Sequence, residues 1–350
     1  MTRVVVCNSQ APFISGGAEI LADGLHRALV RRGYDVATAR LPLAVEPRIE
    51  VVRSALAWRL TDLVKLPGRP LPIDAAICLK YPSYVLRHPC KIVWLVHQYR
   101  QVYELLGTPY SDLGDSADDQ AFIGMVRRLD TQALGEARAL YTISRNVAER
   151  LARYNGLRAT PLYHPPQYED RYRCESYGDY VFTVSRQDPL KRVDLLIKAM
   201  PYTRSGVRAV IAGVGPELAA NKALAAQLGV AERVEFIGYV DEARLIDLYA
   251  RALAVYYAPF DEDYGYVTLE AFLSGKAVVT AGDSGGTLEF VKDGETGLVF
   301  DPQDPASLGA ALDSLMTVSG QAAALGGAGY RVAAPITWDR VVDALTAPIP

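Results

Sequence analysis

Short apolar runs rich in β-branched residues alternate along this chain with longer stretches in which apolar residues recur every three or four positions. Runs of the first kind predict buried strands, and stretches of the second kind predict amphipathic helices. The alternation is typical of a doubly wound parallel sheet, which carries helices on both faces. In the first half the expected strands are 4–7, 35–39, 75–79, 92–96 and 140–143, and the expected helices are 18–31, 54–65, 118–137 and 146–154.

The pattern is interrupted between residues 155 and 179, where prolines and tyrosines occur without periodicity. Such a stretch is typical of an interdomain linker. A second series of strands is then expected at 180–184, 207–212, 233–237, 252–257 and 277–280. We therefore predict an α/β protein with two doubly wound, Rossmann-like domains that face each other across a cleft. The predicted parts are an N-terminal domain (1–165), a linker (166–179), a C-terminal domain (180–335) and a C-terminal helix (336–350) that packs back toward the first domain.

Composition limits the classes of partner. Of the 350 residues, 50% are hydrophobic and 22% are charged, with a formal net charge of -3. This is the composition of an ordinary globular chain, without the basic face that nucleic acid requires. No apolar run approaches the roughly 18 residues that cross a bilayer. The first residues lead straight into the strand at 4–7 rather than into a secretory leader, which predicts a cytoplasmic protein.

The four cysteines, Cys7, Cys78, Cys90 and Cys174, show no C-x-x-C spacing, and two of them lie within apolar strand patterns. Buried free thiols are therefore expected rather than disulfides or metal ligands. No cluster of histidines and carboxylates suggests a bound cation, so we predict no metal site and no cofactor.

The most informative motif is a pair of glutamates, Glu262 and Glu270, on either side of the glycine turn at Gly265. An apolar strand precedes the pair and a helical pattern follows it, so both carboxylates belong at the carboxyl end of a parallel strand, where ligands bind. Carboxylates accept hydrogen bonds from vicinal hydroxyls, and a helix N-terminus favours anionic oxygens. The alternative is that both residues are ordinary solvated or capping acids.

Other strand ends carry weaker signals. Gly16 and Gly17 open the first helix, where they could let an anion approach the backbone or could simply form a turn. His97 ends an apolar strand, and is either a ligand contact or a structural hydrogen-bond donor. Arg186 and Lys191 follow the first strand of the second domain and suit a diphosphate, unless they are ordinary exposed cations.

Three further glycine turns occupy strand ends in the second domain. Gly213 and Gly215 form G-x-G without the third glycine of a dinucleotide fingerprint, and could pass close to a planar base. The backbone at Gly238 and Tyr239 could read a base edge. Gly285 and Gly286, followed by Glu289, open one more helix.

The order of these motifs is more specific than any one of them. With G-G-A-E near the start, His97, Arg186 and Lys191, G-x-G-P-E, F-x-G, E-x7-E and G-G-x-x-E, the chain resembles the family 4 glycosyltransferases of GT-B fold. Residues 293–302 and 337–339 add further matches. The resemblance is dense from 180 to 308, but in the first domain it is confined to 16–19, 97 and 142–144.

The resemblance implies a role for each matching residue. Arg186 and Lys191 would hold the donor diphosphate and offset its growing charge. Glu270 would accept hydrogen bonds from the nucleotide ribose, and Glu262 from the transferred sugar. The remaining donor contacts would be His97 near the reacting carbon, Gly16 and Gly17 over the diphosphate, and the backbone amides of Tyr266, Val267 and Thr268.

The implied activity is transfer of a sugar from a nucleoside-diphosphate sugar to an acceptor hydroxyl with retention of anomeric configuration, without a metal. UDP is favoured over GDP or ADP only as the common choice. The acceptor would be a glycan, a lipid-linked saccharide or a small molecule. Two alternatives stay open: a nucleotide-sugar epimerase, with His97 as its obvious base, and an inactive nucleotide-sugar-binding partner subunit.

Departures from the family pattern concern the donor and acceptor sites. Tyr264 lies in the turn where the family commonly has phenylalanine, and would bring a phenol to the sugar, while Lys276 stands where proline is frequent. Residues 51–66 form a basic amphipathic pattern in which Trp58 could anchor at a membrane surface. Packing on the sheet is the favoured interpretation of that helix. The acidic stretch 111–119 is interpreted as a flap over the acceptor or as a solvated loop.

Overall fold

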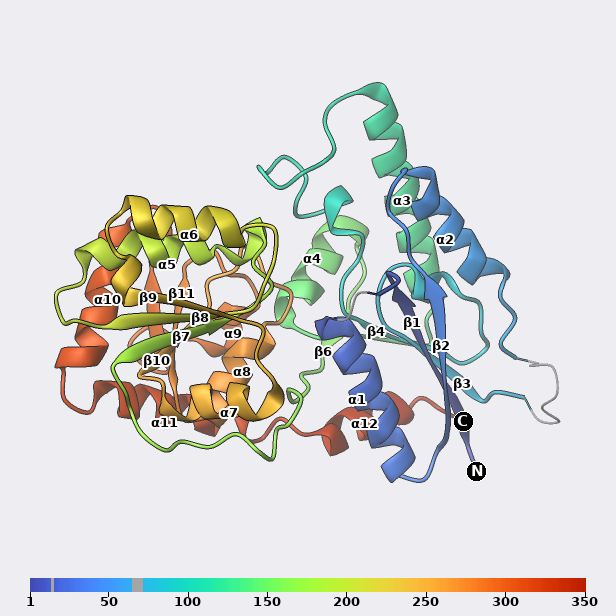
Figure 1. The fold of residues 1–350 in the computed structure, drawn as a ribbon. Coiled ribbons are helices and arrows are strands. Elements are labelled where there is room, and N and C mark those ends of the chain that lie inside the picture. Colours follow the sequence, from blue (N-terminus) through green and yellow to red (C-terminus); the bar gives the residue numbers. More distant parts are fainter. Residues whose placement is uncertain (14–15, 65–71) are drawn as a thin grey trace. The chain divides into compact units, whose positions relative to one another are not determined.

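The computed structural model describes residues 1–13, 16–64 and 72–350 (Figure 1). The chain divides into two compact units, which we call unit 1 (Met1–Gln167 with Thr337–Pro350) and unit 2 (Tyr168–Ile336). Each unit is a parallel sheet with helices on both faces, so the predicted fold class of two doubly wound domains is confirmed.

In unit 1, six described strands form a sheet in the order β2-β1-β3-β4-β5-β6, with every neighbouring pair parallel. The strands are β1 (Arg3–Gln10), β2 (Asp35–Pro42), β3 (Ala75–Cys78), β4 (Lys91–Leu95), β5 (Ala139–Thr142) and β6 (Thr160–Pro161). The helices are α1 (Gly17–Arg31), α2 (Ile49–Leu60), α3 (Ala117–Gly135), α4 (Arg145–Asn155) and α12 (Trp338–Thr346), with short 3-10 turns η1 (Ser83–Val85) and η2 (Arg100–Val102).

In unit 2, six strands form a second parallel sheet in the order β12-β11-β10-β7-β8-β9. They are β7 (Tyr180–Val184), β8 (Arg208–Ala212), β9 (Val234–Gly238), β10 (Ala254–Tyr256), β11 (Ala277–Ala281) and β12 (Gly297–Phe300). The α-helices are α5 (Val193–Ala199), α6 (Leu218–Gln227), α7 (Glu242–Arg251), α8 (Tyr266–Leu273), α9 (Thr287–Phe290), α10 (Pro305–Thr317) and α11 (Gln321–Ala333), and the 3-10 turns are η3 (Pro189–Lys191), η4 (Met200–Tyr202) and η5 (Ala231–Arg233). Figure 1 shows α5 and α6 over one face of this sheet and α7 and α8 over the other.

The central strands of both sheets are apolar at nearly every position because helices cover both faces. All five residues of β11 are buried, as are all five of β4. The sequence of a strand that is buried on both faces is a continuous apolar run, without alternation of apolar and polar residues. This is why the apolar runs in the sequence located the strands.

The structure differs from the predicted elements at three places. The two-residue strand β6 lies inside the stretch 155–179 that was expected to be irregular, and β12 was not predicted. The helix expected at 54–65 is α2, which begins at Ile49 and ends at Leu60, and residue 65 lies outside the described residues. Too few residues contribute to β6 for a pattern to reveal it.

Helix α2 packs on unit 1 through the tryptophan that the membrane interpretation used as an anchor. Trp58 is fully buried, and its indole N–H donates to Ser9 Oγ at 2.8 Å. Trp58 is therefore a core residue, as expected from the favoured interpretation that this helix packs on the sheet, and its side chain does not anchor at a membrane surface. No helix in the described part of the chain is long and apolar enough to cross a membrane.

The last helix, α12, packs within unit 1. The Trp338 ring lies against Gly24 of α1, where a Cβ atom would stand 2.3 Å from the ring, and it stacks on the His164 ring at 6.1 Å. The Tyr141 hydroxyl donates to Ala344 O at 3.0 Å. These contacts attach residues 337–350 to the sheet of unit 1 although more than 160 residues of unit 2 intervene.

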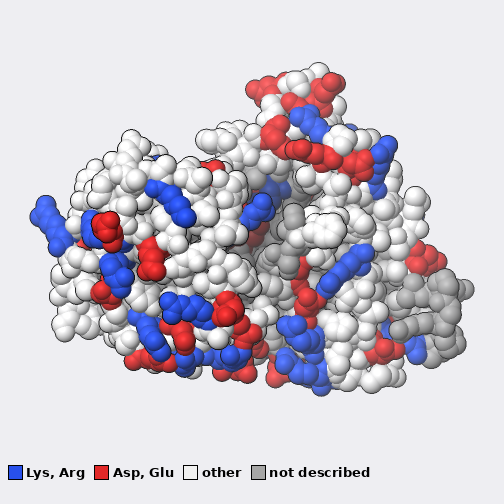
Figure 2. Space-filling view, viewed as in Figure 1, with Lys and Arg blue, Asp and Glu red and all other residues white. Residues whose placement is uncertain are grey.

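The acidic stretch before α3 has a defined local structure. Ser116 caps α3 by accepting the Asp119 N–H at 3.1 Å, and Asp119 accepts the Gly114 N–H at 3.0 Å and pairs with Arg48. Figure 2 shows acidic side chains gathered over the start of α3, whereas blue and red side chains are mixed elsewhere on the visible face. The Asp119 contacts hold the stretch against α2 and α3.

Candidate active site

In unit 2 the candidate residues lie where the strand order reverses. The chain moves from β7 outward to β8 and β9, and then returns to the other side of β7 to form β10. The loops after β7 and β10 therefore leave the sheet in opposite directions, which opens a crevice at their carboxyl ends. Lys191 lies on the loop after β7, and Glu262 and Glu270 follow β10.

Arg192 ties these two loops together. Its guanidinium is buried and donates to the carbonyl oxygens of Ala258 and Pro259 at 2.8 and 2.9 Å, and to both carboxylate oxygens of Asp283 at 2.6 and 2.8 Å. A planar guanidinium satisfies several acceptors at fixed angles. Arg192 therefore fixes the loop that leads to Glu262 relative to the start of α5.

Gly285 and Gly286 allow a third loop to approach the glutamate loop. A Cβ atom at Gly285, which has φ +58°, would lie 2.7 Å from the backbone nitrogen of Glu262, and one at Gly286 would lie 2.6 Å from Asp263 O. The Gly286 N–H donates to Glu262 O at 2.7 Å. No side chain larger than hydrogen fits here, so the paired glycines position the backbone of Glu262.

Lys191 and Glu262 form the centre of the site. The Lys191 ammonium is ion-paired with Glu262 Oε2, which also accepts a hydrogen bond from the Tyr257 hydroxyl at 2.9 Å. Burial raises the pKa of Tyr257, and the charges of Glu262 and then Glu270 raise it further. Glu262 and Tyr257 are therefore direct partners, and Glu270 lies on the helix that follows them. That both glutamates serve one ligand stays a prediction.

Glu270 lies on α8 and is surrounded by phenols. The Tyr249 hydroxyl donates to Glu270 Oε2 at 2.6 Å. Burial raises the pKa of Glu270 to about 7, although hydrogen bonding by tyrosine lowers it. The Tyr172 hydroxyl is buried near this carboxylate, yet makes no hydrogen bond of good geometry with a described residue. Glu270 can therefore gain or lose a proton near neutral pH.

The first turn of α8 carries the three predicted backbone contacts, Tyr266, Val267 and Thr268. The helix begins after Gly265, whose φ of +83° a residue with a side chain rarely adopts. The first N–H groups of a helix lack intrahelical acceptors and favour an anion. The Thr268 hydroxyl is buried without a hydrogen-bond partner among the described residues, which leaves a further polar group unsatisfied in this turn.

Arg186, also on the loop after β7, is exposed and forms no ion pair with another described residue. The structure places it at the same strand end as Lys191 without bringing its side chain into the cluster of Lys191, Glu262 and Tyr257. Its predicted contact with a diphosphate stays a prediction.

Gly213 and Gly215 have a packing role that the sequence did not reveal. A Cβ atom at Gly213 would lie 2.0 Å from Ser185 O, and one at Gly215 would lie 2.2 Å from Gln187 O. The loop after β8 therefore needs glycine because it packs directly on the loop after β7. Tyr239, after β9, is 84% exposed, and contact of any of the three with a nucleotide base stays a prediction.

In unit 1 the corresponding reversal lies between β1 and β3, and the Gly16 turn is beside it. The Gly16 N–H donates to Glu19 Oε2 at 2.9 Å, while Glu19 Oε1 accepts from Lys80 at 2.7 Å and from Asn8 at 3.4 Å. Glu19 thus joins the start of α1 to the ends of β1 and β3. In the sequence Glu19 was only one member of a motif, whereas in the structure it is the residue that holds this turn together. Gly17 is the first residue of α1 and is exposed.

His97 follows β4 and is partly buried. Its Nδ1 lies 2.8 Å from Gln98 O, and a carbonyl can only accept, so Nδ1 carries the proton in this arrangement. This backbone contact fits the second alternative for His97, that of a structural hydrogen-bond donor. Contact with a ligand stays a prediction.

Tyr264 lies in the turn between the two glutamates and is buried. It is 3% exposed, and its ring packs edge-on against Tyr266 and Phe290 with centroid distances of 5.9 and 5.5 Å. The expectation that it brings a phenol close to the sugar stays a prediction. The phenols that contact the two glutamates are Tyr257 and Tyr249, which lie 5 and 21 residues away from their partners.

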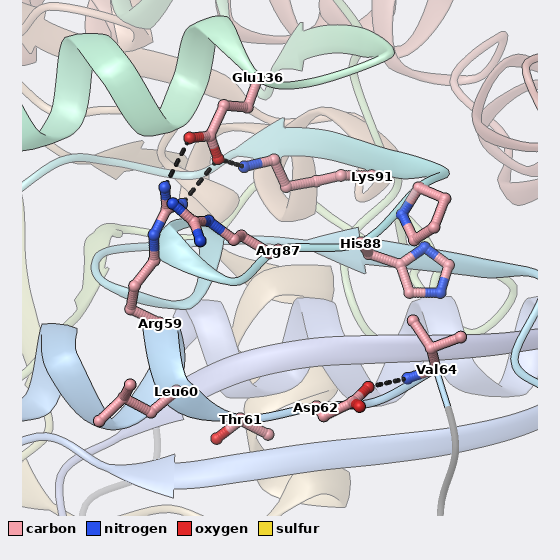
Figure 3. A pocket seen from close by; sticks show the side chains of 10 residues that line it. Arg59, Leu60, Thr61, Asp62, Val64, Arg87, His88, Lys91 and Glu136 are labelled. Atoms are coloured by element: carbon pink, nitrogen blue, oxygen red, sulfur yellow. Dashed lines mark hydrogen bonds and ion pairs between the residues drawn. The ribbon is translucent and has the colours of Figure 1, made fainter.

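A cavity of about 480 Å³ in unit 1 contains none of the predicted site residues (Figure 3). In Figure 3 the Glu136 carboxylate accepts hydrogen bonds from Arg59, at 2.7 Å to each oxygen, and from Lys91 at 3.1 Å. The hydrogen bonds from Arg59, followed by those from Lys91, lower the pKa of Glu136 to about 2. The Glu136 carboxylate is thus paired with two cations of the protein itself, so we interpret the cluster as structural.

Replacing Glu136 with glutamine is expected to destabilise unit 1, because the buried Lys91 ammonium loses its carboxylate. Partial exposure of Glu136 reduces the cost of a broken buried pair to about 2 kcal/mol, or roughly 5 °C in melting temperature. The carboxylate stabilises the fold above its ordinary pKa, and this contribution is lost as the pH falls toward about 2. Melting curves of wild type, Glu136→Gln and the exposed control Glu149→Gln at pH 7 and pH 3 would test this; equal melting temperatures at pH 7 would contradict it.

Two doubly wound domains with these strand orders define the GT-B class of fold. A solved structure, Anabaena HepE in complex with UDP-glucose, is 16% identical to this chain, with a TM-score of 0.73 over 98% of this chain and 97% of that one. Residues 172–332, slightly less than half of the chain, match the family model described as Glycosyl transferases group 1. Nearly all of unit 2 thus has the sequence pattern of that family.

Two curated relatives are similar over part of their length. The D-inositol 3-phosphate glycosyltransferase of Acidothermus cellulolyticus is 34% identical over 181 residues, which are 48% of this chain and 40% of that protein. The GDP-mannose-dependent alpha-(1-6)-phosphatidylinositol monomannoside mannosyltransferase of Mycolicibacterium smegmatis is 38% identical over 169 residues, or 44% of each protein. The chain therefore matches less than half of either relative.

Proposed function

We propose that this protein is a retaining glycosyltransferase of family 4, which moves a sugar from a nucleoside-diphosphate sugar to an acceptor hydroxyl. The observation that carries the proposal is the Lys191–Glu262 ion pair beside the Tyr257 phenol, at the strand reversal of unit 2, with Glu270 on the helix that follows Glu262. One cation and two hydroxyl acceptors in one crevice suit a ligand that joins a diphosphate to two hydroxyl-rich rings.

In this proposal Lys191 and Arg186 bind the diphosphate, and Glu270 accepts hydrogen bonds from the ribose. Glu262, which is ion-paired with Lys191 in the ligand-free chain, accepts hydroxyls of the transferred sugar. The diphosphate then competes with Glu262 for the lysine. Tyr257 keeps a hydrogen bond to Glu262 throughout, and so holds the carboxylate in place when the ammonium turns to phosphate.

The proposed reaction forms a bond between the acceptor oxygen and the anomeric carbon as the bond from that carbon to the diphosphate breaks. The leaving diphosphate takes the bonding electrons, and the acceptor proton passes to one of its oxygens on the same face. Lys191 and Arg186 stabilise the charge that develops there. The protein thus contributes positioning and electrostatic stabilisation, and no step uses a metal ion.

The substrates are proposed from chemistry and from the relatives. UDP-glucose in Anabaena HepE and GDP-mannose in the mycobacterial mannosyltransferase make UDP- and GDP-hexoses the first donors to test. We propose a glycan, a lipid-linked saccharide or a small polyol as acceptor. The inositol phosphate named for the Acidothermus relative is one such polyol.

Calorimetric titration with UDP, GDP and ADP, followed by incubation with the matching sugar donors, tests the proposal. We expect one nucleoside diphosphate to bind in the micromolar range and its sugar donor to release that diphosphate when an acceptor is present. Failure of all three to bind at millimolar concentration would contradict the proposal. Conversion of the donor sugar without any acceptor would instead indicate an epimerase, and binding without turnover an inactive partner subunit.

A further inference from the structure

Three lysine side chains among the described residues are buried: Lys80, Lys91 and Lys276 are 9%, 1% and 0% exposed. A buried ammonium is costly unless hydrogen-bond acceptors and a negative charge surround it. Lys80 meets this need with Glu19 at 2.7 Å, and Lys91 with Glu136 at 3.1 Å. Lys276, the most deeply buried of the three, forms no ion pair with any carboxylate in the described ranges.

The groups that contact the Lys276 ammonium include one that can become an anion. Its Nζ donates to Ser176 O and lies 3.3 Å from the sulfur of Cys174. The centroid of the Tyr177 ring is 4.1 Å away, on a tyrosine whose hydroxyl donates to Gly275 O. A carbonyl and an aromatic face attract a cation without carrying a full charge. A Cys174 thiolate would supply the missing negative charge.

The other charged groups near this pair are already engaged. Glu175 accepts hydrogen bonds from Arg173 and Arg251, each at 2.8 Å, and Arg173 also pairs with Asp247. Burial lowers the pKa of Lys276, whereas its contact with Cys174 and the charge of Glu175 raise it. Glu175 thus acts on Lys276 at longer range, and the direct contact belongs to the cysteine.

Cys174 differs from the other cysteines in exposure. Cys7, Cys78 and Cys90 are buried, as the sequence predicted for all four, whereas Cys174 is exposed. Burial raises the pKa of Cys7 well above its ordinary value, so that thiol stays protonated. A thiol reacts as its thiolate, and a neighbouring cation together with solvent access favours that form. Cys174 alone combines a cation contact at its sulfur with access from solvent.

We propose that Cys174 is a nucleophilic thiolate paired with the buried Lys276, and that it is a site of reversible oxidation by hydroperoxides. The thiolate sulfur attacks one oxygen of hydrogen peroxide, so that an S–O bond forms as the O–O bond breaks. Sulfur is oxidised by two electrons and the peroxide is reduced. The released hydroxide takes a proton to become water, and a sulfenic acid remains on Cys174. Cellular thiols can return such an acid to the thiol.

The pairing is tested by the rate at which iodoacetamide alkylates Cys174 in the folded full-length protein, followed by peptide mass spectrometry. At pH 7 we expect the rate to be about tenfold higher in wild type than in Lys276→Met, since an unassisted thiol is mostly protonated at that pH. The two rates should converge above pH 9. Lys292→Met removes a lysine whose ammonium donates to the Leu288 carbonyl, and should leave the rate unchanged.

Equal rates at pH 7 in wild type and Lys276→Met would overturn the proposal. Should Lys276→Met fail to fold, the alkylation rate of Cys174 in wild type at pH 7 decides: a rate no higher than that of cysteine in a short unfolded peptide would overturn the pairing, and a higher one supports it. Oxidation is tested separately, by adding hydrogen peroxide and trapping sulfenic acid with dimedone. An adduct on Cys174 that is absent in Cys174→Ser is expected, and no adduct on Cys174 would overturn the oxidation step. None of these readouts needs a sugar donor.

Discussion

Replacing Lys191 with methionine is expected to lower kcat/KM for sugar transfer by about 10²- to 10³-fold, the usual cost of removing one group that stabilises charge in the transition state. In the proposed reaction the diphosphate gains charge as it leaves, and Lys191 lies where that charge develops. Methionine keeps the length and the apolar part of the side chain. The substitution also leaves Glu262 without its cation, so the remaining carboxylate repels the incoming diphosphate.

The matched control is Lys198→Met. Lys198 lies in the neighbouring helix α5 and forms an exposed pair with Asp194, four residues earlier. The Lys198→Met variant should retain wild-type activity, since exposed pairs of this kind contribute little to stability. Initial rates at several donor concentrations, with a melting curve for each variant, would separate a lost charge from a lost fold. A Lys191→Met enzyme within threefold of wild type would contradict the assigned role.

Replacing Glu270 with glutamine is expected to weaken nucleotide-sugar binding about tenfold at pH 8, the value of one charge-assisted hydrogen bond. In the proposed complex the carboxylate accepts from both ribose hydroxyls, whereas an amide offers a single acceptor oxygen. Because the pKa of Glu270 is raised to about 7, the binding form of wild type is depleted as the pH falls through neutrality. Wild-type affinity should therefore fall between pH 8 and pH 6, and that of Glu270→Gln should not.

Titration calorimetry with UDP-glucose, or GDP-mannose if that is the donor that binds, would measure both effects. A nucleotide sugar is preferable to a free nucleoside diphosphate, whose terminal phosphate titrates in the same range. Glu232→Gln, an exposed residue of η5, is the control and should follow wild type at every pH. Parallel pH profiles for wild type and Glu270→Gln would show that Glu270 does not titrate in contact with the ligand.

Much of the fold could be predicted because parallel sheets covered on both faces produce long apolar runs. The strands from β7 to β11 were all located in this way, and the carboxyl ends of β7 and β10 followed from them. The two glutamates were placed in one neighbourhood because their separation of eight residues spans one turn and the start of one helix. Lys191 was assigned to the same crevice from its position after β7.

Other contacts could not be predicted because they join segments that are far apart in the sequence. Tyr249 reaches Glu270 across the space between α7 and α8, and Lys276 meets Cys174 over 102 positions. Local patterns also misjudged burial at one residue. Cys174 was expected inside and is exposed.

By itself the sequence determined which segments are strands, where each strand ends, and which charged residues follow those ends, because hydrophobic periodicity is a local property of the chain. Only the tertiary structure decided the partners of those residues: the Lys191–Glu262 ion pair, the phenols of Tyr257 and Tyr249, and the thiol beside Lys276. Which side chains meet depends on the order in which strands cross the sheet and on how closely loops pack. No single segment encodes either of these.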